Sequence, residues 1–360
     1  MATAARLGFA IPAYRRPDHL DVALASLVPV ARALEAPIYI PDDSCDATNA
    51  AVVEKWQRAY SKLIHEINPR NLGIDRNIDK AIAGCPAEYV HVMGEDDVIL
   101  PGFAEEVMRA IQEASPGHII CSYLYLTNDY RILSASPVIP RLPAPVSLRS
   151  MLPEHGWTLG FIGAHVFHRE RYVHCDRDGF GTYFNHIVRL VTYLSPDEPL
   201  GYVSGALVGN RADDESTATW AANRLDVVFG LERAFVSSMS GRYMDREVAR
   251  TVASCRRRLG YTQSFRLLYW AALMDRTGDD PGFWRSLAKY VSRPRYLALR
   301  AIPRLAYGPL RALVPGVRRI KRFARLLRAN SIQGQARGGA TVGSSIVESA
   351  SVRPSATVDR

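Results

Sequence analysis

The chain has 360 residues, of which 48% are hydrophobic and 22% charged, so it is long enough to bury one large core or two smaller ones. Its 25 glycines and 22 prolines follow no period, which excludes collagen-like and wholly disordered chains. No apolar run approaches the roughly 20 residues of a membrane span, Leu7–Ile11 is too short for a secretory signal, and the five cysteines form no CxxC pair. We therefore expect a reduced, cytoplasmic protein.

The net charge of +9 is unevenly distributed. Residues 293–360 contain 14 Lys or Arg residues and two acidic ones, so the remainder of the chain is slightly acidic. A protein that coats nucleic acid would carry its basic residues over the globular body. We therefore expect no nucleic-acid partner.

The first 115 residues alternate short apolar runs with helical periodicity. Strands are predicted at 7–11, 37–40, 62–67 and 88–93, and helices from residue 17 and at 48–60, 74–83 and 101–114. In the first helix, Leu20, Leu24 and Leu27 share one face. Four strands alternating with helices predict an α/β fold with a doubly wound, mostly parallel sheet and right-handed crossovers.

The middle of the chain is less regular. Strands are predicted at 119–126, 132–138, 161–168 and 201–208, and a helix at 183–194, with a proline-rich loop after residue 137. From about 219 to 292 the pattern is helical throughout. We interpret this region as a C-terminal helical layer on the same body.

The C-terminal segment differs from the rest. Residues 293–328 contain 11 Lys or Arg residues interleaved with leucines and no acidic residue, a basic amphipathic pattern that suits an anionic membrane surface. The alternative is a basic helix pair that packs on the core. Residues 329–360 are rich in Ser, Ala and Gly, and we expect a mobile tail. Ile346, Val352 and Val358 recur every six residues, as in hexapeptide-repeat acyltransferases, so a β-helix remnant is the alternative there.

Ligands of open parallel sheets bind beyond the carboxyl ends of the strands, and all four loops there are polar. The loops are Pro12–Arg16, Asp42–Asp46, Asn68–Gly73 and Gly94–Asp97. Carboxylates facing Arg15, Arg70 and Arg76 would suit a metal-bound diphosphate, because the cation bridges phosphates and carboxylates while arginines hold the other oxygens.

Each loop also has a structural interpretation. Asp42-Asp43 in isolation is typical of an Asx-turn or helix cap. Gly73 could be a helix-entry glycine and Asn77 a solvated helix residue. The three consecutive acids after Gly94 repel one another unless a cation is bound, so they indicate a metal site more strongly.

The order of these motifs resembles the inverting family-two glycosyltransferases of GT-A fold. The resemblance runs from "FAIPAYRRPDHL" through "IYIPDDSCDATN" and "NPRNLGIDRNIDKAI" to "YVHVMGEDDVILPGF". It covers residues 7–103, under a third of the chain. The "MGEDDVILPG" form and the later "FIGAHVFHRERY" look most like abequosyltransferase-type members that build bacterial O-antigens.

The resemblance implies roles for the matching residues. Those assigned to the nucleotide-sugar are Pro12, Tyr14, Arg15, Asp42, Asp43, Arg76, Glu95 and Asp96. Among them, Asp42 would accept a hydrogen bond from the base, Arg76 would reach the pyrophosphate and Asp96 would touch the ribose. Asp97 would bind Mg²⁺ or Mn²⁺, completing a DXD-type motif in which Glu95 stands where relatives usually place Asp.

The general base is an acidic residue before a later helix in that family, often within Glu-Asp. The corresponding stretch, "CDRDGFGTYFNHIVRL", contains no such pair. We assign the base to Asp178, with His186 and then Asp176 as alternatives and residues such as Asp213 behind them. A lone histidine at 186 is also typical of a packed helix residue.

These features predict a metal-dependent, inverting glycosyltransferase, peripheral at the inner membrane face, that moves a sugar from a nucleotide donor to a lipid-linked bacterial surface glycan. Residues 1–120 would bind the donor, 121–292 the acceptor, and 293–328 the membrane. One rival is a non-catalytic descendant that organises glycan assembly, because the Glu-Asp pair is missing. A sugar-nucleotidyltransferase would carry a glycine-rich loop after the first strand, and a glycosidase would need no diphosphate-binding arginines.

Overall fold

The computed structural model describes residues 5–127, 130, 132, 137–211, 224–259, 284–285, 287–288 and 292–301. The first part of the chain forms β1 (Ala5–Ala10), α1 (Pro17–Ala33), β2 (Ile38–Asp42), α2 (Ala50–Ala59), β3 (Leu63–Ile67), α3 (Ile74–Gly84), β4 (Ala87–Val92), β5 (Val98–Ile99) and α4 (Phe103–Ala114). Every strand and helix predicted before residue 115 is confirmed. Only the two-residue β5 was not predicted, because so short a strand has no periodicity.

The second part forms β6 (His118–Leu126), α5 (Leu148–His155), η1 (Gly156–Gly160), η2 (Ile162–Ala164), β7 (His165–His168), α6 (Arg169–Val173), α7 (Asn185–Tyr193), β8 (Gly201–Arg211), α8 (Arg224–Met239), α9 (Asp245–Leu259) and α12 (Arg293–Arg300). The predicted strand at 161–168 is wrong in its first half. Residues 156–164 form two 3-10 turns instead, because glycines at 156, 160 and 163 lower the strand propensity.

Eight strands make one sheet in the order β3-β2-β1-β4-β7-β6-β8-β5. Strands β1 to β4 are mutually parallel where they pair, whereas β7 runs antiparallel to both β4 and β6, and β5 antiparallel to β8. The prediction of a doubly wound, mostly parallel sheet is confirmed. The reversal at β7 is the feature that sequence periodicity did not contain.

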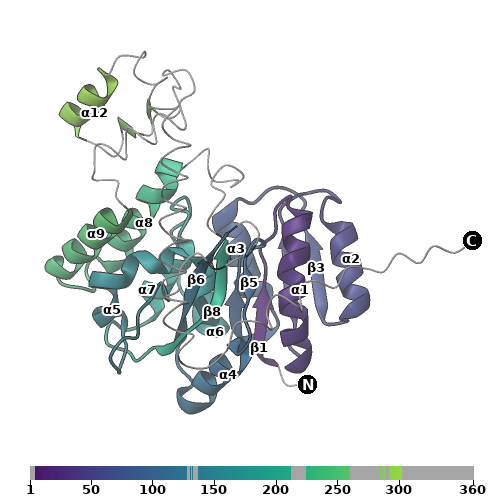
Figure 1. Ribbon diagram of the computed structural model, residues 1–360. Helices are drawn as coiled ribbons and strands as arrows, with labels where there is room; N and C mark the ends of the chain where they lie inside the picture. Colours follow the sequence, from purple (N-terminus) through teal and green to yellow (C-terminus); the bar gives the residue numbers. More distant parts are fainter. Residues whose placement is uncertain are drawn as a thin grey trace, which may run out of the picture.

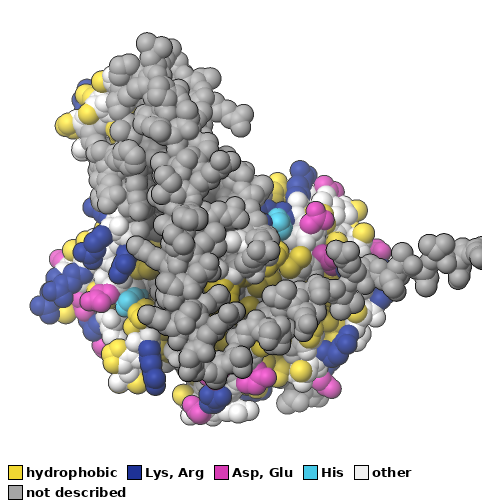
Figure 2. Space-filling view, viewed as in Figure 1, with side chains coloured by type: hydrophobic (Ala, Val, Ile, Leu, Met, Phe, Trp, Pro, Cys, Tyr) yellow, Lys and Arg dark blue, Asp and Glu magenta, His cyan; other side chains and the backbone are white. Residues whose placement is uncertain are grey.

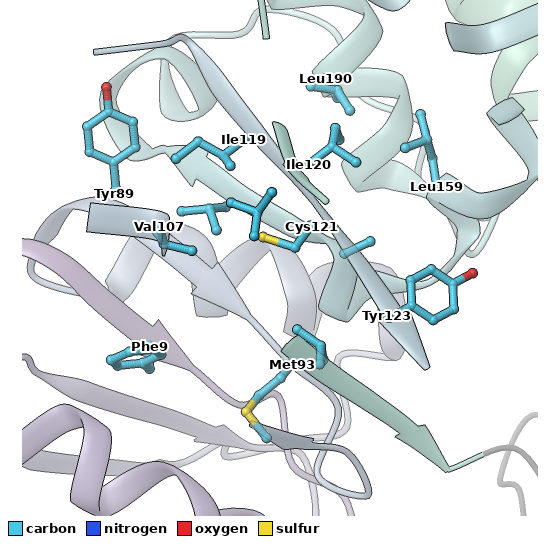
Figure 3. Packing of buried hydrophobic residues seen from close by; sticks show 14 of the residues in the cluster. Phe9, Tyr89, Met93, Val107, Ile119, Ile120, Cys121, Tyr123, Leu159 and Leu190 are labelled. Atoms are coloured by element: carbon cyan, nitrogen blue, oxygen red, sulfur yellow. The ribbon is translucent and has the colours of Figure 1, made fainter. Parts of the chain in front are cut away.

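Helices cover both faces of the sheet (Figure 1). Phe9 and Tyr89 point into the larger core cluster, which also contains residues of α1, α4 and α7. Their neighbours in sequence, Ala10 and Val90, belong to a second cluster with α3 and α6. Alternate strand residues therefore fill opposite layers, as a sheet buried on both faces requires. Figure 3 shows the larger cluster, with Phe9 and Met93 close to the strands and Leu190 on a helix.

The helices after β8 form the expected additional layer. α8 contacts α7, and α9 contacts α5 and η1, with Phe235, Met239 and Cys255 fully buried. In Figure 2, Lys and Arg side chains gather at the left, where Figure 1 places α9. Within the described residues no helix is long and apolar enough to cross a bilayer.

Several predictions fall on residues outside the described ranges. The predicted strand at 132–138 is described only in part, with one bridge between Leu126 and Ile132. Of the basic segment 293–328, the structure describes residues 293–301, in which Leu299 is buried and Leu297 exposed. The tail 329–360 and Asp213 lie outside the described residues.

Candidate active site

The carboxyl ends of β1, β2 and β4 meet at one edge of the sheet. Ala10 pairs with Tyr39 of β2 and with Val92 of β4, and beyond the strands the Asp43 N–H donates to the Ala13 carbonyl at 2.9 Å. Three of the four predicted loops, 12–16, 42–46 and 94–97, are thereby placed side by side. Sequence order alone separates them by up to 85 residues, so the parallel register is what assembles the site.

The acidic run after β4 lies against the loop after β1. Glu95 accepts a hydrogen bond from the Tyr14 N–H at 2.7 Å. Arg16 lies 2.9 Å from Asp96 and 3.8 Å from Glu95, and Arg211, at the end of β8, lies 3.6 Å from Asp96. Two mostly buried arginines therefore balance part of the negative charge.

Asp97 and Asp96 converge over Gly94. The Gly94 N–H donates to Asp97 Oδ2 at 3.1 Å, and the Arg211 N–H donates to Asp97 Oδ1 at 3.4 Å. A Cβ at position 94 would lie 2.7 Å from Asp97 Oδ2 and 2.9 Å from Asp96 Oδ1, closer than real Cβ atoms approach such oxygens. Only glycine leaves room for carboxylate oxygens of both residues at one point.

Burial makes two of these carboxylates difficult to ionise. It raises the pKa of Glu95 to about 8, although the Tyr14 N–H and Arg16 act in the opposite direction. It also raises the pKa of Asp97 well above the usual range, and the neighbouring Asp96 adds to this. A cation at this point would favour the ionised forms of both groups.

The oxygens over Gly94 fit a divalent cation that a diphosphate also ligates. Mg²⁺ commonly takes one or two carboxylates from the protein and completes its coordination with phosphate and water oxygens. Within the described part of the chain, no three His, Cys, Asp or Glu residues are arranged to hold a metal by themselves. Asp96 and Asp97 would therefore supply only part of the coordination.

Asp42 is buried at the carboxyl end of β2. Its side chain has 0% exposure and accepts hydrogen bonds from the Ser44 N–H at 2.9 Å, from Asn49 Nδ2 at 3.1 Å and from His65. Burial opposes ionisation, but the bonds from His65, Ser44 and Asn49 outweigh it and lower the pKa of Asp42. The bond to Ser44 is that of an Asx-turn, as the structural interpretation of Asp42 predicts; contact of Asp42 with a nucleobase stays a prediction.

Asp43 organises the loop after β3. Its carboxylate accepts hydrogen bonds from Asn68 Nδ2 at 2.9 Å, the Leu72 N–H at 2.8 Å and the Gly73 N–H at 2.9 Å. Gly73 has a φ of 79° directly before α3, so it is a helix-entry glycine. Asn77 is only 3% exposed and donates to the Pro41 carbonyl at 3.2 Å; its interpretation as a solvated residue is wrong.

The three predicted arginines are placed differently from Arg16. Arg15 is exposed and pairs with Asp46 at 3.3 Å. Arg70 is exposed, and Arg76 stacks over the ring of Phe180 with 4.2 Å to the centroid. Pro12 and Tyr14 are partly buried at the start of the loop.

Sequence reasoning missed the roles of Arg16 and Arg211. Arg16 could have been noticed, because it belongs to the loop 12–16 at the edge of the sheet and adjoins Arg15. No signal in the sequence pointed to Arg211, which follows Asp97 by 114 residues and reaches it through the pairing of β8 with β5.

The base candidates occupy contrasting environments. Asp176 and Asp178 are exposed on the loop before α7. His186 is 2% exposed, with its Nε2 3.4 Å from the Leu159 carbonyl and its ring centroid 5.3 Å from that of His165. Burial, with His165 nearby, lowers the pKa of His186 to about 3. This is the packed helix residue of the alternative interpretation.

Comparisons with known proteins agree with the fold described above. Residues 9–138 match the model of Glycosyl transferase family 2. The fold is similar to that of S. aureus TarS 1-349, solved in complex with UDP-GlcNAc, at 14% identity and a TM-score of 0.53 over 91% of this chain and 92% of that one. It is also similar to the mannosyltransferase PcManGT from Pyrobaculum calidifontis, in complex with GDP-Man and Mn²⁺, at 13% identity and a TM-score of 0.50 over 91% and 87%. None of the curated proteins compared matches the chain.

The fold and the matched segment define the class of this protein: it is a glycosyltransferase with a GT-A fold. The match covers the four loops at the edge of the sheet and ends before the loop that carries the base candidates.

Proposed function

We propose that this protein is a metal-dependent, inverting glycosyltransferase that uses a nucleotide-sugar donor. The observation that carries the proposal is the convergence of Asp96 and Asp97 oxygens over Gly94, beside Arg16 and Arg211. A diphosphate brings negative charge that needs a cation and arginines, and this edge of the sheet offers ligands for both. The solved neighbours with UDP-GlcNAc or GDP-Man and Mn²⁺ support a sugar nucleotide as the donor class.

In this mechanism Asp97, with Asp96 beside it, would hold a divalent cation, which would supply positive charge next to the leaving diphosphate. The loop 12–16 lies where the nucleoside would bind, with Pro12, Tyr14 and Arg15 as its lining. Arg76 makes no hydrogen bond or ion pair with other described residues, and its guanidinium is exposed over Phe180. It is thus available to a phosphate oxygen.

We assign the proton transfer to Asp178. Inversion requires a base on the face of the sugar opposite the leaving group, and a base must be reachable by the acceptor hydroxyl. Asp178 is exposed, whereas His186 is enclosed by the core. In this proposal Asp178 alone takes the role that the Glu-Asp pair has in the family that the sequence resembles.

The acceptor we propose is a lipid-linked glycan of the bacterial surface, of the O-antigen type, at the inner face of the membrane. The arginines of α12 and the basic residues that follow it in the sequence support binding of the protein to a negatively charged lipid surface.

The donor site can be tested by thermal unfolding with a panel of nucleotide sugars that includes UDP-GlcNAc and GDP-mannose, each with and without Mn²⁺. A donor at about 100 times its Kd stabilises the fold by about 2.7 kcal/mol. We expect one donor to raise the Tm strongly, and only when Mn²⁺ is present.

Asp97→Ala should abolish the Mn²⁺-dependent stabilisation and lower turnover at least about 100-fold, because a group that stabilises transition-state charge is lost. Glu105→Ala, an exposed acid in the first turn of α4, is the matched control and should behave as the wild type. Normal Mn²⁺-dependent turnover by Asp97→Ala would refute the metal assignment. Donor binding with metal, but no release of nucleoside diphosphate, would favour the non-catalytic alternative.

A further inference from the structure

One buried carboxylate on α3 holds the loop that precedes α7. Asp75 Oδ2 accepts hydrogen bonds from the N–H groups of Gly181 at 2.8 Å and Tyr183 at 3.0 Å, and Oδ1 accepts one from Asn185 at 3.1 Å. Asp75 is 7% exposed and lies in the first helical turn, where the helix dipole favours negative charge. A single side chain therefore fixes three backbone positions more than 100 residues away in sequence.

The backbone of this loop is strained at the point that Asp75 holds. Tyr183 has a φ of 67°, and Gly181 has one of 85°. A positive φ is ordinary for glycine but unfavourable for a bulky residue, and it persists only where surrounding contacts enforce it. The hydrogen bond from the Tyr183 N–H to Asp75 is such a contact.

Helix α8 confines the loop from another direction. A Cβ on Gly230 would collide with the carbonyl oxygen of Thr182, so the loop lies directly against the helix backbone. Arg233 of the same helix donates to the Gly181 carbonyl at 3.3 Å. The segment 179–184 is therefore held between α3 and α8.

The proposed base, Asp178, lies directly before this segment. Asp178 is exposed and precedes Gly179, whose N–H donates to Asn185 Oδ1 at 2.7 Å. Phe180, the next residue but one, stacks beneath Arg76, which adjoins Asp75 on α3. Helix α3 thus carries Arg76, the candidate diphosphate contact, and also holds segment 179–184, which directly follows the candidate base Asp178.

We propose that Asp75 is a positioning residue for the transfer reaction: by fixing segment 179–184 against α3, it holds the Asp178 carboxylate in register with a donor bound at Arg76. The proposal rests on the proposed function, in which Asp178 takes the proton. Proton transfer requires placement within hydrogen-bond reach, so a displacement of about 1 Å can lower turnover about 100-fold.

The test uses the full chain with Mn²⁺ and whichever of UDP-GlcNAc and GDP-mannose it binds more tightly, with water as the acceptor and release of nucleoside diphosphate as the readout. Asp75→Asn retains the shape but places an amide N–H₂ against backbone donors. We expect its kcat to fall about 10- to 100-fold, with the donor Kd within about two-fold of the wild type. Asp21→Asn is the control: Asp21 of α1 accepts hydrogen bonds from Lys55 Nζ at 2.7 Å and from Trp56 Nε1 at 2.6 Å, both on α2. It should retain kcat.

A double-mutant cycle separates positioning from general destabilisation. If Asp75 acts through Asp178, adding Asp75→Asn to Asp178→Asn lowers kcat no further, whereas independent effects multiply. Multiplied effects, or wild-type kcat in Asp75→Asn, would overturn the proposal. If Asp75→Asn fails to fold, Gly230→Ala serves instead, because its methyl group displaces the loop from the α8 side. Gly230→Ala should then lower kcat at an unchanged donor Kd. Full kcat in Gly230→Ala would also overturn the proposal.

Failure of the proposed function gives different results. Wild-type turnover by Asp178→Asn would refute the base assignment and this proposal with it. If the wild type binds neither donor, or binds one but releases no nucleoside diphosphate, the proposed function fails. Backbone amide hydrogen exchange in segment 179–185 then shows whether Asp75 orders the loop. Faster exchange there in Asp75→Asn than in Asp21→Asn would support the positioning role, and equal exchange would overturn it.

Discussion

At the scale of single residues, four histidines are buried in the core: His118, His165 and His186 lie near α7, and His91 packs against Phe9 and Phe103. His118 Nε2 and His165 Nδ1 are 3.0 Å apart, and His186 and His91 complete the group. Burial lowers the pKa of all four, to about 4 for His91 and His165 and to about 3 for His186. These imidazoles are therefore neutral in the folded protein near neutral pH.

The histidines should make the protein sensitive to acid. Below pH 6.5 the unfolded chain binds protons that the folded chain does not, so the free energy of unfolding falls as the pH falls towards 4, by up to about 1.4 kcal/mol per pH unit for each such group. The raised pKa values of Glu95 and Asp97 act in the opposite direction.

His186→Gln tests this account. Glutamine cannot be protonated, so the difference in Tm between pH 7 and pH 5 should be smaller than in the wild type, while donor turnover at pH 7 stays within a few-fold of the wild type. An inactive His186→Gln combined with an active Asp178→Asn would make His186 the base.

At the scale of elements, the site depends on loops that are stabilised by buried polar side chains. Asp43, after β2, accepts hydrogen bonds from the Leu72 and Gly73 N–H groups at the start of α3. Asn77 of α3 donates a hydrogen bond to the Pro41 carbonyl in β2. Strand ends present backbone groups that would otherwise lack partners. These short polar side chains satisfy them and set the position of α3.

Asp43→Ala should therefore affect stability and donor binding together. Removal of the acceptor takes three hydrogen bonds from the donors of Asn68, Leu72 and Gly73, which we expect to cost about 1–3 kcal/mol, and the displaced loop 68–73 should weaken donor binding several-fold. Chemical denaturation and donor titration measure the two effects. Asp46→Ala, an exposed acid on the same loop, is the matched control and should unfold as the wild type does; an equally mild Asp43→Ala would contradict this role.

At the scale of the whole molecule, the donor-binding edge and the basic C-terminal segment are separate parts. Every described residue in the metal and diphosphate region belongs to residues 12–97 or to Arg211, whereas the concentrated positive charge begins at residue 293. Binding of donor and binding of an anionic surface should therefore be separable.

Deletion of residues 293–360 should release the protein from liposomes that contain anionic phospholipid while donor hydrolysis continues at a similar rate. Each Lys or Arg near such a surface contributes about 1 kcal/mol at low salt. Co-sedimentation with anionic and with neutral liposomes measures the effect. Equal binding of the truncated and full-length proteins to anionic liposomes would show that the surface lies elsewhere.

The sequence by itself determined the N-terminal sheet and its helices, because apolar periodicity and turn residues are local and agree with the fold in that region. The sequence also located the acidic run after β4 and the polar loops 12–16, 42–46 and 68–73. It did not predict the 3-10 turns before β7 or the antiparallel direction of β7, because neither has a periodic pattern.

Only the tertiary structure decided which charged residues meet. The carboxylates of Asp42 and Asp43 accept hydrogen bonds from Ser44 and Asn68, and Arg16 and Arg211, rather than Arg15, lie beside Asp96. The burial of His186 is likewise known only from the fold. The physical reason is that the pKa and the availability of a side chain depend on burial and on partners distant in sequence, and only the folded packing supplies these.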